Sequence, residues 1–287
     1  MANDFYVCQS TQECLLNGIM CLMNISMGAV RLYRNSVLRL LSHETIARLE
    51  LVRVDLPARR EIEFPGNEIK HLFFLEAGAA SMTTTFLDGD QVEVALCGNE
   101  AVLGSSYLLG TRRSLNRVYM QVPGFGYSTK TALAAQEFRR SERFHDLILR
   151  YTQTQFIQSA QTAGCNVHHS VEQRLARWIL LCLDRVGGPI EITQDFIAMM
   201  LGNQRSSVSA EAAKLQKLGL IEYTRGRIVV SDRAGLELRA CECYATVRND
   251  LEHYTDDDWD LERFKVGDRS TLAGNAGSDP LLSSEQL

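Results

Sequence analysis

The fold is decided by two adjoining stretches of the sequence, ITQDFIAMMLGNQRSSVSAEAAKLQKL at residues 192–218 and GLIEYTRGRIVV at residues 219–230. The first stretch predicts a short helix that begins after Thr193 and ends at Gly202. A threonine side chain can accept from the free amides of a first helical turn, and glycine ends helices because it adopts the left-handed conformation easily. Beyond the turn, an apolar face at helical spacing predicts a second helix over residues 205–218. The predicted inner face of this helix consists of Val208, Ala212, Leu215 and Leu218.

The second stretch predicts two β-strands joined around Arg225-Gly226-Arg227. A glycine at the tip favours a tight hairpin, since it reaches positive φ without steric cost. Two helices joined by a short turn and followed by a hairpin are typical of a winged helix-turn-helix, whose second helix enters the major groove of DNA. We define the predicted DNA-binding set as the polar and basic side chains that would meet a duplex: Thr193, Gln194, Gln204, Arg205, Ser206, Ser209, Lys214, Arg225 and Arg227.

The members of this set have different expected roles. Thr193 and Gln194 lie at a helix N-terminus, where free backbone amides can hold a phosphate. The first turn of the second helix, with Arg205, would reach base edges, where arginine pairs with guanine and glutamine with adenine. Lys214 and the arginines of the hairpin would contact phosphates.

Upstream of this motif, short alternating segments extend from about residue 55 to residue 128. Turn signals separate them, namely Pro65-Gly66-Asn67, Ala77-Gly78, Asp88-Gly89-Asp90 and Pro123-Gly124. Asp-Gly between two alternating runs is a strong hairpin signal. We therefore predict a small β-barrel or jelly roll, preceded by a short amphipathic helix within residues 35–54.

Residues 132–163 contain neither proline nor glycine and predict one long helix. A second helix over residues 167–185 is stopped by Gly187-Gly188-Pro189. The long helix has an apolar edge at three- and four-residue spacing, formed by Phe144, Leu147, Ile148, Tyr151, Gln155 and Gln158. A helix of about 25 residues spans nearly 40 Å, longer than one small barrel needs for cover. We therefore assign this edge to the seam of a homodimer. The alternative is a helix packed on its own barrel.

The order of these parts resembles the Crp/Fnr family of transcription regulators, over roughly residues 35–249. The resemblance is carried by Phe64-Pro65-Gly66, by the run EQRLARW at residues 172–178, and by residues 193–209 with Gly219-Leu220-Ile221. It implies an α+β fold with an N-terminal double-stranded β-helix (jelly-roll, cyclic-nucleotide-binding-like) sensor, a dimerisation helix and a C-terminal winged helix-turn-helix. It also implies a homodimer that binds double-stranded DNA, recruits or blocks RNA polymerase, and responds to a small effector.

The predicted domain boundaries follow this order along the chain. They are an N-terminal extension at 1–34, the sensor at 35–131, the dimerisation helix at 132–165, the winged helix-turn-helix at 166–249, and an acidic, disordered tail at 250–287.

The cyclic-nucleotide signature of this family is incomplete here. Members that bind cyclic nucleotides have a Gly-Glu pair and a later Arg-Ser/Thr-Ala run, whereas this sequence has Gly98-Asn99-Glu100 and Arg113-Ser114-Leu115. Capture of a phosphate depends on closely fitted, charge-assisted hydrogen bonds. We therefore expect a sensor that does not bind cyclic nucleotides, and its effector stays open.

The eight cysteines are spread along the chain and indicate reduced thiols rather than a disulfide framework. Cys8, Cys14, Cys21 and Cys97 could hold an iron-sulfur cluster, since the iron-sulfur members of the family also use cysteines near the N-terminus and one in the barrel. The spacings between the N-terminal cysteines are wider here than in those members. Zinc on Cys241, Cys243 and His253 is a second alternative, although a Cys-x-Cys pair is less suited to one ion than Cys-x-x-Cys. Inert thiols without a cofactor are the preferred interpretation.

Composition is compatible with a nucleic-acid partner. Apolar residues at 45% and charged residues at 23% are typical of globular proteins. Residues 250–287 hold ten acids and three bases, a net charge of −7, so the total of −5 leaves +2 for residues 1–249. The acidic balance therefore belongs to the C-terminal end, and the body of the chain can approach a polyanion.

Other classes of protein fit less well. The predicted barrel has only His71, whereas a cupin-type metal enzyme needs two histidines and a carboxylate, so we expect no catalytic activity. The uncharged stretch at residues 14–30 contains Asn17 and Asn24 and lacks a basic leader, so we expect a cytoplasmic protein without a membrane segment. The rival function is a ligand- or metal-sensing jelly roll whose winged helix mediates protein contacts.

Overall fold

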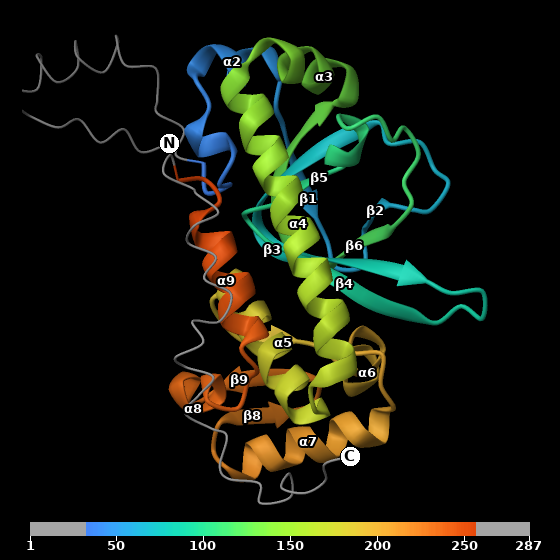
Figure 1. Ribbon diagram of the computed structural model, residues 1–287, viewed down its shortest axis with the longest axis vertical. Helices are drawn as coiled ribbons and strands as arrows, with labels where there is room; N and C mark the ends of the chain where they lie inside the picture. The colour runs from blue at the N-terminus through green and yellow to red at the C-terminus, as the bar shows by residue number, and fades with distance from the viewer. Residues whose placement is uncertain (1–32, 257–287) are drawn as a thin grey trace, which may run out of the picture.

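The computed structural model describes residues 33–256 of the chain. A β-barrel domain lies at one end of the molecule and a helical domain with a small sheet at the other, and helix α4 (Glu142–His168) runs alongside both (Figure 1). The prediction of an α+β fold, with a β domain followed by a helix-turn-helix domain, is confirmed. Within the described residues, no helix combines the length and apolar character that crossing a bilayer needs.

The barrel is an antiparallel sheet of six strands. Its central path is β1-β6-β3-β4, with β2 paired to β6 and β5 paired to β3. The strands are β1 (Val52–Leu56), β2 (Glu61–Glu63), β3 (His71–Thr85), β4 (Gln91–Cys97), β5 (Val102–Leu103) and β6 (Arg117–Lys130), and a 3-10 turn, η2 (Ser105–Tyr107), follows β5.

Two of the predicted turns do not form, because their residues lie inside two long strands that pair with each other. The Ala77-Gly78 and Pro123-Gly124 signals lie within β3 and β6, whose pairing shifts register there. A Cβ built on Gly124 would lie 1.9 Å from the carbonyl oxygen of Ala77, and one on Gly78 would lie 2.7 Å from that of Val122. These glycines let two backbones approach closely, which is the other common reason for glycine in a strand.

The segment before the barrel also differs from the prediction of one helix within residues 35–54. It forms a 3-10 turn, η1 (Leu38–Leu40), a short helix, α2 (His43–Arg48), and the start of β1. The Ser42 side chain accepts from the Thr45 amide and so starts a new helix. Asn35 is fully buried, and its amide nitrogen donates to the carbonyls of Leu75 and Ala101, which fixes this segment to the barrel.

The predicted long helix is divided at Ser141 into α3 (Thr131–Arg140) and α4. Ser141 has extended backbone angles, and its hydroxyl accepts from the Phe144 amide, so it caps α4. This break turns α4 back along the barrel, where Leu147 and Ile148 are fully buried in the barrel core.

The assignment of this apolar edge to a dimer seam is therefore wrong. Phe144 is fully buried, Tyr151 is 1% exposed, and the rings of Phe74 and Phe144 lie 6.4 Å apart. The open side of the barrel is apolar, and α4 covers it within one chain. The alternative reading of a helix packed on its own barrel is the correct one for these residues.

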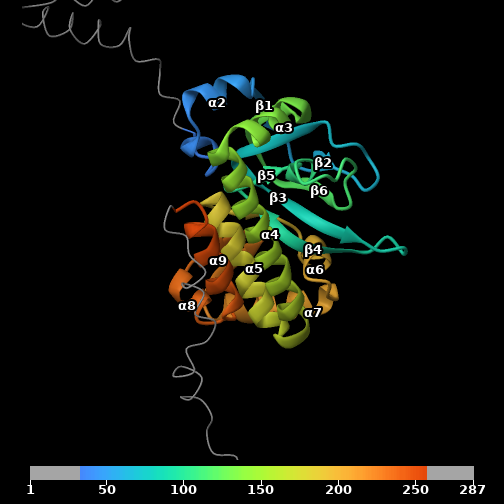
Figure 2. The ribbon, with the colours of Figure 1, turned by 45° about the horizontal axis from the view of Figure 1, so that its top comes forward.

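The last described residues also differ from the prediction. Helix α9 (Cys243–His253) packs alongside α4 and α5 (Val171–Val186), as both views show (Figure 2). Asp250 is 2% exposed and Tyr254 fully buried, and the Tyr254 hydroxyl donates to the Glu100 carbonyl at 2.8 Å. Residues 250–256 are thus part of the folded domain, and the remainder of the predicted tail, like most of the predicted N-terminal extension, lies outside the described residues.

The C-terminal domain surrounds α5. Its elements are β7 (Ile190–Glu191), α6 (Gln194–Met200), α7 (Arg205–Lys217), β8 (Ile221–Thr224), β9 (Arg227–Val230) and α8 (Arg233–Glu237), and its sheet has the order β7-β9-β8. Helices α6 and α7 and the β8–β9 hairpin form the predicted winged helix-turn-helix.

One hydrophobic cluster crosses the boundary between the two domains and joins Leu96 and Tyr119 of the barrel to the C-terminal domain. The Trp178 indole donates to the Glu93 carboxylate at 2.9 Å, and the Tyr119 and Phe196 rings meet edge to face at 6.1 Å. A buried ion pair joins Arg185 of α5 to Glu100 of the barrel at 2.8 Å. The barrel therefore contacts the winged helix through specific polar groups as well as apolar ones.

Candidate nucleic-acid interface

The helix-turn-helix is built by local capping. The Thr193 hydroxyl accepts from the Phe196 amide at 3.3 Å and starts α6. Gly202 follows the helix with φ of +57°, a conformation that costs glycine little. Gln204 then precedes α7, so the short turn predicted from Gly202 to Gln204 is present.

Helix α7 has one buried face and one exposed face. Val208 and Leu215 are fully buried and Ala212 is 5% exposed, whereas Leu218, predicted on the inner face, is 50% exposed. Arg205 and Ser206 are exposed in the first turn. Sequence reasoning did not assign Ala210, Ala213 and Lys217 to the DNA-binding set, although their three- and four-residue spacing from Ser206 carries the same exposed face along the helix.

Polar contacts hold the start of α7 against α6. The Ser209 hydroxyl donates to the Gln194 side-chain oxygen at 2.6 Å, and Arg205 forms an ion pair with Asp195 at 3.1 Å. Both members of this pair are about two-thirds exposed, and exposed ion pairs contribute only about 0–1 kcal/mol. Arg205 can therefore exchange Asp195 for another acceptor at little cost in free energy.

The hairpin of β8 and β9 turns tightly at its tip. Arg225 and Gly226 have φ of 50° and 78°, as a two-residue turn that follows the strand twist requires. The Ile192 amide donates to the Gly226 carbonyl at 2.6 Å, which ties this hairpin to the residue before the Thr193 cap. The hairpin and the start of α6 are thus held together.

The remaining members of the DNA-binding set carry exposed charge. Arg227 lies 3.4 Å from Glu191, and Lys214 lies 2.7 Å from Glu211, whose hydrogen bond raises the pKa of the lysine. Lys214 is nine residues along α7 from Arg205, about 13 Å at the helical rise of 1.5 Å per residue. The structure brings most of the set to one end of α7 and to the hairpin, with Lys214 further along the same helix.

This arrangement is matched by a known domain. A family model described as the Crp-like helix-turn-helix domain matches residues 173–239, which span α5 to the end of α8. The chain is a Crp/Fnr-type transcription regulator. Its DNA-binding part is the Crp-like helix-turn-helix domain.

Relatives and solved structures agree with this assignment. The global nitrogen regulator of a Nostoc species is 23% identical over 182 residues, which cover 60% of this chain and 81% of that protein. The structure of FixK2 from Bradyrhizobium japonicum has a TM-score of 0.59 at 15% identity, covering 67% of this chain and 98% of FixK2. CLP of Xanthomonas campestris, a c-di-GMP responsive global regulator, has a TM-score of 0.56 at 16% identity, covering 66% and 99%. At these identities the solved structures establish the fold.

A cavity of about 320 Å³ lies between the barrel and α4; we call it the sensor pocket, after the role predicted for this domain. Apolar side chains and small hydroxyls dominate its lining, and its one charged side chain is Glu63. Glu63 accepts from the Ser114 hydroxyl at 2.7 Å and from the Gly104 amide at 2.8 Å. Burial raises the pKa of Glu63, and these two hydrogen bonds oppose the rise.

The residues that stand where cyclic-nucleotide binders carry their signature have other partners here. Arg113 donates to the Gly66 carbonyl at 2.7 Å, and it does not line the sensor pocket. Glu100 accepts from the Gly98 amide at 3.0 Å and pairs with Arg185. Both charged groups therefore contribute to contacts within the protein.

The cysteines predicted as alternative metal ligands separate into two groups. Cys8, Cys14 and Cys21 lie outside the described residues. Cys97 is fully buried, and burial raises the pKa of its thiol to about 12, which disfavours the thiolate that a metal needs. His253, on the exposed side of α9, contacts the Asn249 carbonyl at 2.8 Å.

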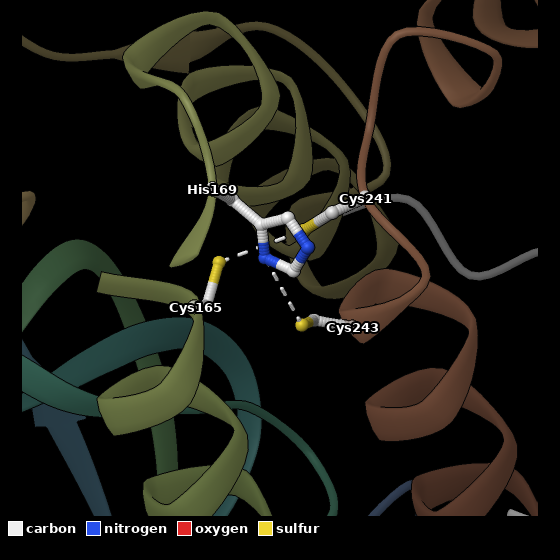
Figure 3. Close-up of side chains that lie close together, drawn as sticks. All are labelled: Cys165, His169, Cys241 and Cys243. Atoms are coloured by element: carbon white, nitrogen blue, oxygen red, sulfur yellow. Dashed lines mark hydrogen bonds between the residues drawn. The ribbon is translucent and has the colours of Figure 1, made fainter. Parts of the chain in front are cut away.

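Cys241 and Cys243, by contrast, lie beside two residues that the sequence analysis did not connect with them. Cys165 and His169, at the C-terminal end of α4, complete a compact group with these two cysteines (Figure 3). The local signal was the separation of four residues between Cys165 and His169, about one helical turn, at the end of α4. The association across 76 residues, from Cys165 to Cys241, is visible only in the fold.

Proposed function

We propose that this regulator acts in the cytoplasm as a homodimer that binds a two-fold symmetric site in double-stranded DNA. In this proposal α7 enters the major groove, the hairpin contacts the flanking backbone, and bound protein recruits or blocks RNA polymerase. The observation that carries the proposal is the exposed face of α7, whose first turn presents Arg205 and Ser206 next to the Thr193 cap. Its role is regulatory, without a reaction of its own.

The proposed contacts follow the chemistry of each side chain. Arg205 and Gln204 read base edges in this proposal. Arginine can donate two hydrogen bonds to guanine, and a glutamine amide can donate one hydrogen bond to adenine and accept another from it. Ser206 and Ser209 assist them from the same turn, and the exposed methyl groups of Ala210 and Ala213 suit the methyl group of thymine.

The proposed phosphate contacts surround this reading face. Thr193 and Gln194 bind one phosphate at the start of α6, because the N-terminus of a helix favours an anion. Lys214, Arg225 and Arg227 add exposed positive charge on either side. These contacts orient the protein on the duplex and carry no sequence preference of their own.

The proposed dimer uses an exposed face of α4, which borders the sensor pocket at Phe156. Apolar side chains are exposed on this face at successive intervals of seven, four, three and four residues. They are Leu149, Phe156, Ala160, Ala163 and Val167. Phe156 is 68% exposed and Val167 is 91% exposed. A stripe with this repeat favours packing against a second helix, and a two-fold pairing would bury it.

The proposed effector of the sensor pocket is a small molecule other than a cyclic nucleotide. The pocket offers Glu63 and an apolar lining, and a carboxylate repels a phosphodiester. Glu100 and Arg113, which stand near the positions of the cyclic-nucleotide signature, are engaged with Arg185 and Gly66. These contacts favour a neutral or cationic ligand.

The test is selection of binding sites from a random duplex library, followed by titration of the selected duplex at several salt concentrations. DNA binding predicts an enriched two-fold motif and an affinity that falls steeply with salt, because phosphate contacts release counterions. The half-sites should lie about 34–36 Å apart, one helical turn of DNA. A library without enrichment and an affinity independent of salt would favour the rival function, in which the winged helix binds protein.

A further inference from the structure

Three separate segments of the chain meet at the junction between α4 and the C-terminal domain. Cys165 lies in the last turn of α4, and His169 follows directly after that helix. Cys241 lies between α8 and α9, and Cys243 is the first residue of α9. All four ligand atoms of these residues, one from each side chain, lie within 4.8 Å of one another (Figure 3). We call this group the Cys3His cluster.

Two separations within the Cys3His cluster are close to those around a single ion, and all of its ligand atoms lie within 4.8 Å of one another. The Cys165 and Cys241 sulfurs are 3.5 Å apart, and the Cys243 sulfur is 3.6 Å from His169 Nδ1. Tetrahedral zinc, with bonds of about 2.3 Å to sulfur and about 2.0 Å to nitrogen, requires edges of about 3.8 Å between sulfurs and about 3.5 Å between sulfur and nitrogen. An iron-sulfur cluster with several irons would spread its ligands over different metal atoms.

The histidine is oriented by a second contact. Its Nδ1 faces the sulfur of Cys243, and its Nε2 lies 3.2 Å from the carboxylate of Glu242. Metal-binding histidines commonly donate their other ring N–H to a carboxylate in this way, which fixes the ring and its tautomer. Since Glu242 lies between two of the cysteines in sequence, the same short segment supplies two ligands and this support.

The surroundings of the Cys3His cluster are buried and include positive charge. Cys165 is 1% exposed, and Cys241 and Cys243 are each 4% exposed, so the sulfurs are shielded from solvent. Arg174 and Arg177, both less than one-tenth exposed, bring positive charge into the same region. Zinc bound by three thiolates and a neutral imidazole has a net charge of −1, and positive charge from the two arginines lies near it.

We propose that Cys165, His169, Cys241 and Cys243 bind one zinc ion in a closed structural site. Four protein ligands leave no position for water, which distinguishes structural from catalytic zinc. The ion joins the end of α4 to the α8–α9 connection, and so fixes the winged helix-turn-helix relative to the helix that carries the proposed dimer stripe. The inference concerns metal binding and does not depend on the proposed DNA contacts.

The experiment measures metal on the full chain purified under reducing conditions. We expect about one zinc per chain by mass spectrometry of the metals, and the tetrahedral thiolate spectrum of cobalt(II) when that ion replaces zinc. Cys241→Ser and Cys243→Ser should lose the ion. His253→Asn, the matched histidine control on the same helix, and a triple Cys8, Cys14 and Cys21 to Ser variant should both keep it.

A further variant distinguishes a direct effect on zinc binding from loss of the fold. Glu242→Ala keeps all four ligands and removes only the support of His169, so its affinity for zinc, measured by competition with a chelator, should fall about 10- to 100-fold. The proposal is overturned if reduced protein binds no zinc or cobalt, if Cys241→Ser and Cys243→Ser retain the ion, or if a Cys165–Cys241 disulfide persists in place of a metal site.

Discussion

One buried carboxyl at the contact between barrel and winged helix, Glu93, should lower the stability of this regulator as pH rises from about 5 to 8. Glu93 is 6% exposed, and its Oε1 accepts from the Trp178 indole at 2.9 Å. Its Oε2 has no hydrogen-bond partner among the described residues. Burial raises the pKa of Glu93 from 4.5 to about 7, and the hydrogen bond from Trp178 only partly opposes this rise.

The magnitude follows from proton linkage. A carboxyl whose pKa is higher in the folded state retains its proton there, so between pH 4.5 and about 7 the folded state binds more protons and the free energy of unfolding falls with rising pH. At 1.36 kcal/mol for each pH unit, the full difference is about 3.4 kcal/mol. Of this, about 2.5 kcal/mol should be lost between pH 5 and pH 8, as an order of magnitude.

The assay is urea unfolding at pH 5, 6, 7 and 8 for three proteins. Glu93→Gln keeps an oxygen for Trp178 and removes the titration, so it should lose about 2.5 kcal/mol less than the unsubstituted protein across this range. Glu222→Gln, at an exposed position of β8, is the control and should follow the unsubstituted protein. Parallel pH profiles for Glu93→Gln and the unsubstituted protein would refute the reasoning.

Three other expectations can be checked with simple measurements. Phe156→Glu should convert the dimer to monomers in light scattering, whereas Arg140→Glu, at an exposed position of α3, should not; a dimer that survives Phe156→Glu contradicts the proposed stripe. Glu100→Gln should destabilise the fold by about 3–5 kcal/mol, since it leaves the buried Arg185 without its ion pair, and a loss below 1 kcal/mol in urea unfolding would contradict that role. Cyclic AMP and cyclic GMP should give no saturable heat in calorimetric titrations at submillimolar concentrations, and saturation would overturn the description of the sensor pocket.

The helix-turn-helix could be predicted from sequence because its signals are local. The Thr193 cap and the turn at Gly202 each act within a few residues, and the structure has both. The hairpin tip at Arg225 and Gly226 is local in the same way. Capping and turn chemistry decide these elements before any long-range contact forms.

The barrel and α4 were harder to predict because the deciding contacts are not local. Gly78 and Gly124 look like turn residues, yet each is required by the approach of a strand about 45 residues away in sequence. The apolar edge at Leu147 and Ile148 fits a partner helix or a barrel equally well by periodicity. Only the packed structure distinguishes these two environments.

The Cys3His cluster shows the same limit for a candidate site. The spacing of Cys241 and Cys243 indicates potential zinc ligands, but it suggests His253 as the third ligand. His253 is on the exposed side of α9, and His169 and Cys165 reach the cysteines from the end of α4. A ligand set that joins segments this far apart cannot be read from spacing alone.

The central claim is that α7 reads base pairs through its first turn. It is tested most directly by competition binding of Arg205→Ala and Lys214→Ala to base-substituted versions of the selected duplex, at two salt concentrations. Arg205→Ala should lose about 1–3 kcal/mol of binding free energy, and the loss should depend on one base pair of each half-site. Lys214→Ala should weaken binding to all sequences alike. It should also reduce the slope of log affinity against log salt by about one for each phosphate that the lysine no longer neutralises. Asp195→Asn, which frees Arg205 from its ion pair, should retain the sequence preference. Equal losses on every sequence for Arg205→Ala would contradict the account.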